Sequence, residues 1–211
     1  MLPDMNKQNK IYMGVVTLIT TVVLGWLYYE SVKPLPGMKI DDLGREHVNV
    51  GTEVTYNSNP PTSGSHYGDP TKFGVYGEVQ DDRNIVHSIE HGYVVMSYNC
   101  DHPEKTGWIP GALAHEGEEF EVLPTSNSAT QSASLSVSFQ SDSCKELVSN
   151  LTSIYNKKGQ KRIIVVPRPS LDTRIALTAW NYLDKFDNFD AGRIEYFIDK
   201  HIDNGPEKIV E

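Results

Sequence analysis

A run of 19 uncharged residues near the N-terminus, Ile11 to Tyr29, constrains this chain more than any other feature of its sequence. As an α-helix such a run extends about 28 Å, close to the roughly 30 Å of a bilayer's hydrocarbon core. The run therefore predicts a transmembrane helix. A cleaved signal peptide is the alternative, although the run is longer than a usual signal-peptide core and no A-x-A-like cleavage site follows it.

The charges that flank this run predict its orientation. Lys7 and Lys10 precede it directly, whereas the other side begins with Glu30. Because positive residues beside membrane helices favour the cytoplasmic side, the sequence predicts a cytoplasmic N-terminal tail and an extracytoplasmic C-terminal domain. The predicted location is a cell membrane that the chain crosses once.

The rest of the chain is long enough for one domain with its own core. The chain has 211 residues, of which 38% are hydrophobic, and this indicates one small domain rather than two large ones. The segment Lys33 to Gly37, KPLPG, cannot continue a helix. The predicted parts are a tail at 1–10, a transmembrane helix at 11–29, a Pro/Gly linker at 30–39 and a domain at 40–207.

The net charge argues against one class of partner. The chain has 28 acidic and 19 basic residues, a formal net charge of −9. Proteins that bind nucleic acids need a basic face to neutralise phosphates, so we expect no nucleic-acid partner. The expected partners are the membrane and a neighbouring membrane protein.

Helical and strand patterns both occur in the domain without regular alternation. A Ser/Thr/Asn-rich composition makes residues 101–143 a loop-rich insertion. The mixture of patterns predicts an α+β fold. We expect helices at 82–91, 144–157 and 190–201, and strands at 93–98, 119–123, 135–139, 162–166 and 175–180.

The chain has two cysteines, Cys100 and Cys144. An extracytoplasmic compartment is oxidising and favours a disulfide between them. Closing a loop of about 45 residues stabilises a fold by about 4 kcal/mol in the chain-entropy account. Two separate buried thiols are the alternative.

The stretch HSIEHG, residues 87–92, holds two histidines four residues apart. On a helix His87 and His91 lie about 6 Å apart and can chelate one ion, whereas on a strand about 13 Å separates them. Glu90 shares that helical face, as a ligand or as a base that polarises bound water. The pattern H-x-x-E-H also occurs in inverted zinc peptidases, but there it lies in a longer helix of a larger enzyme. The motif alone therefore does not predict a protease.

A third histidine follows a stiff segment. In NPPTSGSHY, residues 59–67, Pro60 and Pro61 fix two φ angles, and Thr62 to Gly64 favour a turn just before His66. A stiff arm holds a side chain in place, as a metal ligand requires. The alternative is a rigid connection that leaves His66 at the surface.

Several sequence blocks occur together in a recognisable order. They are GREH at 44–47, YNSNPPTSGSHY at 56–67, GVY at 74–76, VHSIEHGYVVMSY at 86–98, VVPRPSLDTRIALTAW at 165–180 and FIDKHIDNGPE at 197–207. In this order they resemble the bacterial and archaeal domain family of unknown function called DUF3105. The resemblance covers most of residues 40–207 and implies no particular reaction. The sequence departs from the usual family pattern in its long segment 101–143 and at Asn181, where a glycine commonly follows the tryptophan.

Within these blocks lie four histidines: His47, His66, His87 and His91. Four imidazoles and the Glu90 carboxylate, without a thiolate, suit copper or zinc better than magnesium or calcium. We therefore expect a transition-metal site formed by the four histidines, with Glu90 behind them or facing water. Such a site would serve metal handling or a small redox or hydrolytic reaction, and we assign no catalytic residue.

The alternative is a non-catalytic interaction or assembly module of a membrane complex. In that case the four histidines form hydrogen bonds within the core instead of binding metal. We expect the other histidines, His102, His115 and His201, to be structural or solvated.

The predicted orientation can be tested with reporter fusions after Glu211. A reporter that is active only outside the cytoplasm should show activity when it is fused after Glu211. The mature protein should also stay in the membrane at full length. Activity of a cytoplasm-only reporter would contradict the orientation, and release of a shortened soluble form would identify a signal peptide.

Overall fold

The computed structural model describes residues 7–102 and 135–208. The chain forms two compact units that divide between Leu35 and Pro36. The first unit contains helix α1 (Lys7–Val32), and β1 (Met38–Lys39) follows within the segment that we expected to be a linker.

Helix α1 contains a segment, Asn9–Tyr29, that is long and apolar enough to cross a membrane, with a mean hydropathy of 1.8. Large side chains such as Leu18 and Trp26 are exposed along it. The helix therefore needs an apolar environment that the described residues do not provide. By length and composition it is either a membrane span or a signal sequence.

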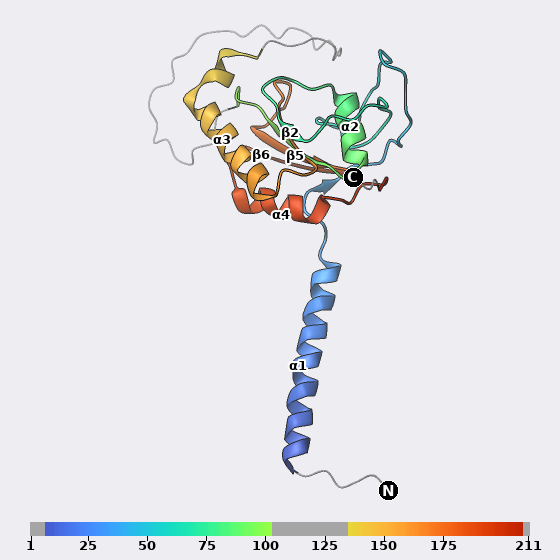
Figure 1. The fold of residues 1–211 in the computed structure, drawn as a ribbon, viewed down its shortest axis with the longest axis vertical. Coiled ribbons are helices and arrows are strands. Elements are labelled where there is room, and N and C mark those ends of the chain that lie inside the picture. The colour runs from blue at the N-terminus through green and yellow to red at the C-terminus, as the bar shows by residue number, and fades with distance from the viewer. Residues whose placement is uncertain (1–6, 103–134, 209–211) are drawn as a thin grey trace, which may run out of the picture. The chain divides into compact units, whose positions relative to one another are not determined.

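One six-stranded sheet forms the centre of the second unit (Figure 1). Besides β1, its strands are β2 (Gly74–Val75), β3 (Val94–Tyr98), β4 (Ile163–Pro167), β5 (Ile175–Ala179) and β6 (Tyr182–Phe186). Their order is β1-β6-β5-β3-β4-β2. The β3–β4 and β4–β2 pairs are parallel, and the other pairs are antiparallel.

Helices cover both faces of this sheet. Helix α2 (Asp82–Glu90) lies on one face, and α3 (Asp142–Lys157) and α4 (Ala191–His201) lie on the other (Figure 1). Side chains alternate along β3, so Met96 packs in the cluster with α3 and α4 whereas Val95 packs with α2. The predicted mixed α+β fold is confirmed.

The expected strand at 135–139 is wrong. The chain there forms a 3-10 helix, η1 (Val137–Gln140), in which Val137 is 85% exposed. Ser141 then caps α3, because its side chain accepts a hydrogen bond from the backbone N–H of Cys144 at 3.2 Å. Among the described residues this segment pairs with no strand. The expected strand at 119–123 lies outside the described residues.

Strand β6 has no counterpart among the sequence-based expectations. It forms a hairpin with β5 in which Ala179 pairs with Tyr182, so that Trp180 and Asn181 form the turn. Asn181 has a φ of 61°, in the left-handed region that glycine and asparagine adopt most readily. Asparagine at this position is therefore compatible with the turn that a glycine would otherwise form.

The two cysteines meet at the edge of the core. Cys100 follows β3, Cys144 lies in the first turn of α3, and their sulfur atoms are 1.96 Å apart, at disulfide distance. The Cys144 side chain is buried beside the cluster that α3 and α4 form on the sheet. The pair thus connects the end of a central strand to the helix that covers it.

Pairing of Cys100 with Cys144 can be tested by intact mass after alkylation. Because the predicted compartment is oxidising, the purified full-length chain should take up no alkyl group without reductant and two after reduction under denaturing conditions. Reduction should lower the free energy of unfolding by about 2–4 kcal/mol. Two alkylated thiols in the absence of reductant would contradict the pairing.

Candidate metal centre

Helix α2 forms one wall of the site, and local sequence signals define both of its ends. Asp81 caps the N-terminus by accepting a hydrogen bond from the Arg83 backbone N–H at 2.9 Å. Gly92, with a φ of 83°, follows the last turn. Ile85 and Ile89 pack against the sheet and fix the rotation of the helix. The helical conformation that metal chelation by HSIEHG requires is therefore present.

His87 is held in one tautomer by its surroundings. Its side chain is buried, and Nδ1 lies 2.7 Å from the Tyr67 carbonyl oxygen. A carbonyl only accepts, so Nδ1 carries the proton, and Nε2 of the neutral ring has a lone pair. That Nε2 lies 3.1 Å from Nε2 of His91.

His66 belongs to the same cluster but comes from a different segment, residues 64–66. Residues 44–48 run beside residues 64–66 through an isolated parallel bridge between His47 and His66. The Val48 N–H donates to the His66 carbonyl at 2.8 Å, and the His66 N–H donates to the Glu46 carbonyl at 3.0 Å. The chain bends at residues 63–65, just before His66, and His66 Nδ1 lies 2.8 Å from the Gly64 carbonyl oxygen. His66 is fully buried, and its second ring nitrogen, Nε2, carries a lone pair when the ring is neutral.

His47 is the solvent-facing member of the group. Its side chain is 54% exposed, and its Nε2 lies 4.0 Å from Glu90 Oε2. Its ring centroid is 4.8 Å from that of His66 and 4.9 Å from that of His87. The site is therefore closed on the side of His66 and open to solvent at His47.

The Glu90 carboxylate is buried against His66 without a compensating hydrogen bond. Glu90 Oε2 lies 3.0 Å from His66 Nε2, and its side chain is 3% exposed. Apart from this contact, neither atom has a hydrogen-bond partner among the described residues. Arg45 is the nearest cation, but its Nη1 is 3.9 Å from Glu90 Oε1 and its side chain is 56% exposed. A proton on His66 Nε2 or a metal ion beside both atoms would compensate this buried contact at 3.0 Å.

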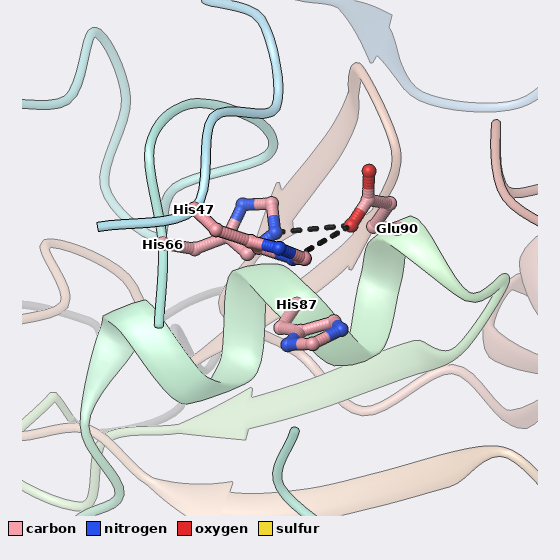
Figure 2. A group of neighbouring side chains, drawn as sticks. All are labelled: His47, His66, His87 and Glu90. Carbon is pink, nitrogen blue, oxygen red and sulfur yellow. Dashed lines mark ion pairs between the residues drawn. The ribbon is translucent and has the colours of Figure 1, made fainter. Parts of the chain in front are cut away.

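The ligating atoms fall into two groups that share Glu90. In the first, those of His47, His66, His87 and Glu90 all lie within 4.8 Å of one another. Figure 2 shows His47 and His66 facing Glu90, with His87 on the same helix as Glu90. The second group consists of Glu90, His91 and Glu207. The structure thus brings three of the four predicted histidines together with Glu90, and it places His91 in the adjoining group.

Burial determines the protonation state of His87. Removal from water is the main reason that its pKa falls from an ordinary 6.5 to about 4. The imidazoles of His91, His66 and His47 lower it further, whereas the hydrogen bond to Tyr67 acts in the opposite direction. His87 is therefore neutral at pH 7 and offers its lone pair to an ion.

The sequence did not predict that Arg45 lies near Glu90 or that Glu207 lies near His91. Both lie in blocks that resemble the family, but their positions have no spacing relation to HSIEHG. Arg45 approaches through the pairing of residues 44–48 with 64–66, and Glu207 through the packing of the C-terminal segment on α2. Only these long-range contacts place them.

Comparisons with known proteins agree with the resemblance of the sequence blocks. A family model described as a protein of unknown function, DUF3105, matches residues 47–137 and 133–211. No curated protein and no solved structure matches the chain.

The low pKa of His87 predicts a pH-dependent stability of the metal-free protein. The unfolded chain binds this proton near pH 6.5 and the folded chain only near pH 4, so the stabilisation is complete above about pH 6.5 and is lost as the pH falls towards 4. The full difference is roughly 3 kcal/mol.

Urea unfolding of the chelator-treated protein, followed by tryptophan fluorescence, measures this effect. The difference between wild type and His87→Gln should shrink steadily from pH 7 to pH 4.5, because glutamine removes the titrating ring. A difference that does not change with pH would show that His87 does not titrate in this way.

Proposed function

The chain belongs to the DUF3105 family, and we propose that its domain binds a transition-metal ion through His47, His66, His87 and Glu90. The main support is the contact between His66 Nε2 and Glu90 Oε2, two buried atoms without hydrogen-bond partners among the described residues. Ligand atoms of a tetrahedral ion with bonds of about 2.0 Å lie about 3.3 Å apart. Their separation of 3.0 Å is close to that spacing.

The donor set favours zinc or copper(II). Three imidazoles and one carboxylate match the preferences of these ions, whereas magnesium and calcium prefer oxygen ligands alone. His47 is 54% exposed, so its position is open to exchange with water or a substrate. This openness favours metal transfer or a reaction at the ion over a closed structural role.

We also propose that the domain lies outside the cytoplasm, attached by α1. Two independent features support this location: the lysines that precede the apolar segment, and the cysteine pair at disulfide distance, which suits an oxidising compartment. An anchored domain of this kind would hand its ion to, or receive it from, a neighbouring membrane protein.

The rival function is an interaction module with structural histidines, and His201 is an example of such a histidine in this fold. His201 is buried between Tyr182 and Phe197, and its Nε2 donates to the Pro36 carbonyl at 2.8 Å. His66 differs, because its Nε2 faces a carboxylate while its Nδ1 already holds the proton. This difference favours metal binding at His66.

Metal binding can be tested on the full-length chain purified in detergent. After removal of metal with a chelator and addition of micromolar zinc or copper, wild type should retain the ion through gel filtration. His66→Ala and His87→Ala should lose it, and Glu90→Gln should bind at least tenfold more weakly, because each change removes a ligand atom.

His102→Ala is the matched control, since it removes an imidazole outside the cluster and should bind like wild type. Circular dichroism establishes that each variant is folded. Folded wild type that retains neither metal, or a His66→Ala variant that binds as tightly as wild type, would refute the proposal.

A further inference from the structure

We infer that the centre holds two ions, with Glu90 bridging them and with His91 and Glu207 completing the second position. The inference rests on the proposed function of the first group. The ligating atoms of Glu90, His91 and Glu207 all lie within 4.8 Å of one another. His91 and Glu207 fall outside the first group, so one ion with bonds of about 2.0–2.2 Å does not reach every ligand.

The position of Glu90 suits a bridge. It is the one residue common to both groups, and its side chain is 3% exposed. Its Oε2 atom faces His66 and His47 without a hydrogen-bond partner among the described residues. A carboxylate has two oxygens and can bind one ion with each. Bridged ions in proteins lie about 3.5–4 Å apart.

His91 faces the second position. Its Nε2 lies 3.7 Å from Glu207 Oε2 and 3.1 Å from His87 Nε2. The His91 side chain is only 11% exposed. His87 donates through Nδ1 to Tyr67, so in the metal-free protein His91 Nε2–H donates to the His87 Nε2 lone pair. Two ions would replace this hydrogen bond, with His87 Nε2 on the first ion and His91 Nε2, its proton moved to Nδ1, on the second.

The C-terminal segment that carries Glu207 is fixed to α2. The Asp203 N–H donates to the Gly92 carbonyl at 2.9 Å, and the Glu207 N–H donates to the Glu90 carbonyl at 3.2 Å. Between them, a Cβ on Gly205 would lie 2.0 Å from the Glu90 carbonyl oxygen, so only glycine permits this approach. Glu207 is therefore held beside Glu90 by backbone contacts.

Electrostatics favour a cation at this place. Glu90 and Glu207 bring two carboxylates to the C-terminal end of α2, where the helix dipole is also negative. The nearby cation Arg162 is paired with Asp203 at 2.7 Å, and Arg45 approaches Glu90 only to 3.9 Å. A second ion would neutralise the two carboxylates directly.

Zinc stoichiometry tests this inference on the full-length chain in detergent. The chelator-stripped protein is titrated with zinc, and bound zinc per chain is measured after gel filtration. Wild type should bind two ions, Glu207→Gln should bind one, and the matched exposed carboxylate variant Glu146→Gln should still bind two.

The outcomes separate the inference from the proposal on which it rests. One ion in wild type would overturn the second site and leave the proposed function intact, whereas none would overturn both. Two ions in both wild type and Glu207→Gln would place the second ion elsewhere and also overturn the inference.

A second measurement uses copper(II) in place of zinc. Two copper(II) ions that share a carboxylate couple magnetically, so the paramagnetic resonance signal per copper should fall sharply in doubly loaded wild type. It should return to full intensity in singly loaded Glu207→Gln. Uncoupled copper in doubly loaded wild type would contradict the bridge.

Discussion

The contact between His66 Nε2 and Glu90 Oε2, 3.0 Å apart and buried, is the constraint on which the rest of the site depends. The Gly64 carbonyl holds a proton on the other nitrogen of His66, so the buried contact between Nε2 and Glu90 is compensated by a second proton or by a metal ion. Without a cation this arrangement costs several kcal/mol. In the proposed function, a metal ion at this point turns the same contact into two metal–ligand bonds.

Three segments that are distant in sequence meet around this contact, and the sheet supplies the platform. Helix α2 is anchored through Ile85 and Ile89 on β3 and β4, which places His87 and Glu90. The strand-like pairing of residues 44–48 with 64–66 adds His47 and His66. The packing of Gly205 on Glu90 adds the C-terminal segment. Rigid elements therefore hold the buried candidate ligands His66, His87 and Glu90, whereas His47 and Glu207 are about half exposed.

Local patterns predicted the parts of the site that depend on local structure. The helical spacing of HSIEHG is a short-range feature and is present, and the chain bends just before His66, where a turn was expected. The grouping of Glu90 with His47 and of His91 with Glu207 depends on contacts between distant segments, which no periodicity encodes. The fold shows the same division: the buried strands β3 and β4 were evident from their apolar residues, whereas the half-exposed β6 was not.

X-ray absorption at the zinc edge of the zinc-loaded, full-length protein tests the central claim most directly. Metal held by His66, His87 and Glu90 predicts nitrogen and oxygen ligands at about 2.0–2.1 Å. It also predicts the outer-shell scattering of imidazole rings, reduced in His66→Ala. A spectrum of oxygen ligands alone, without imidazole scattering, would contradict the account and leave these histidines a structural role.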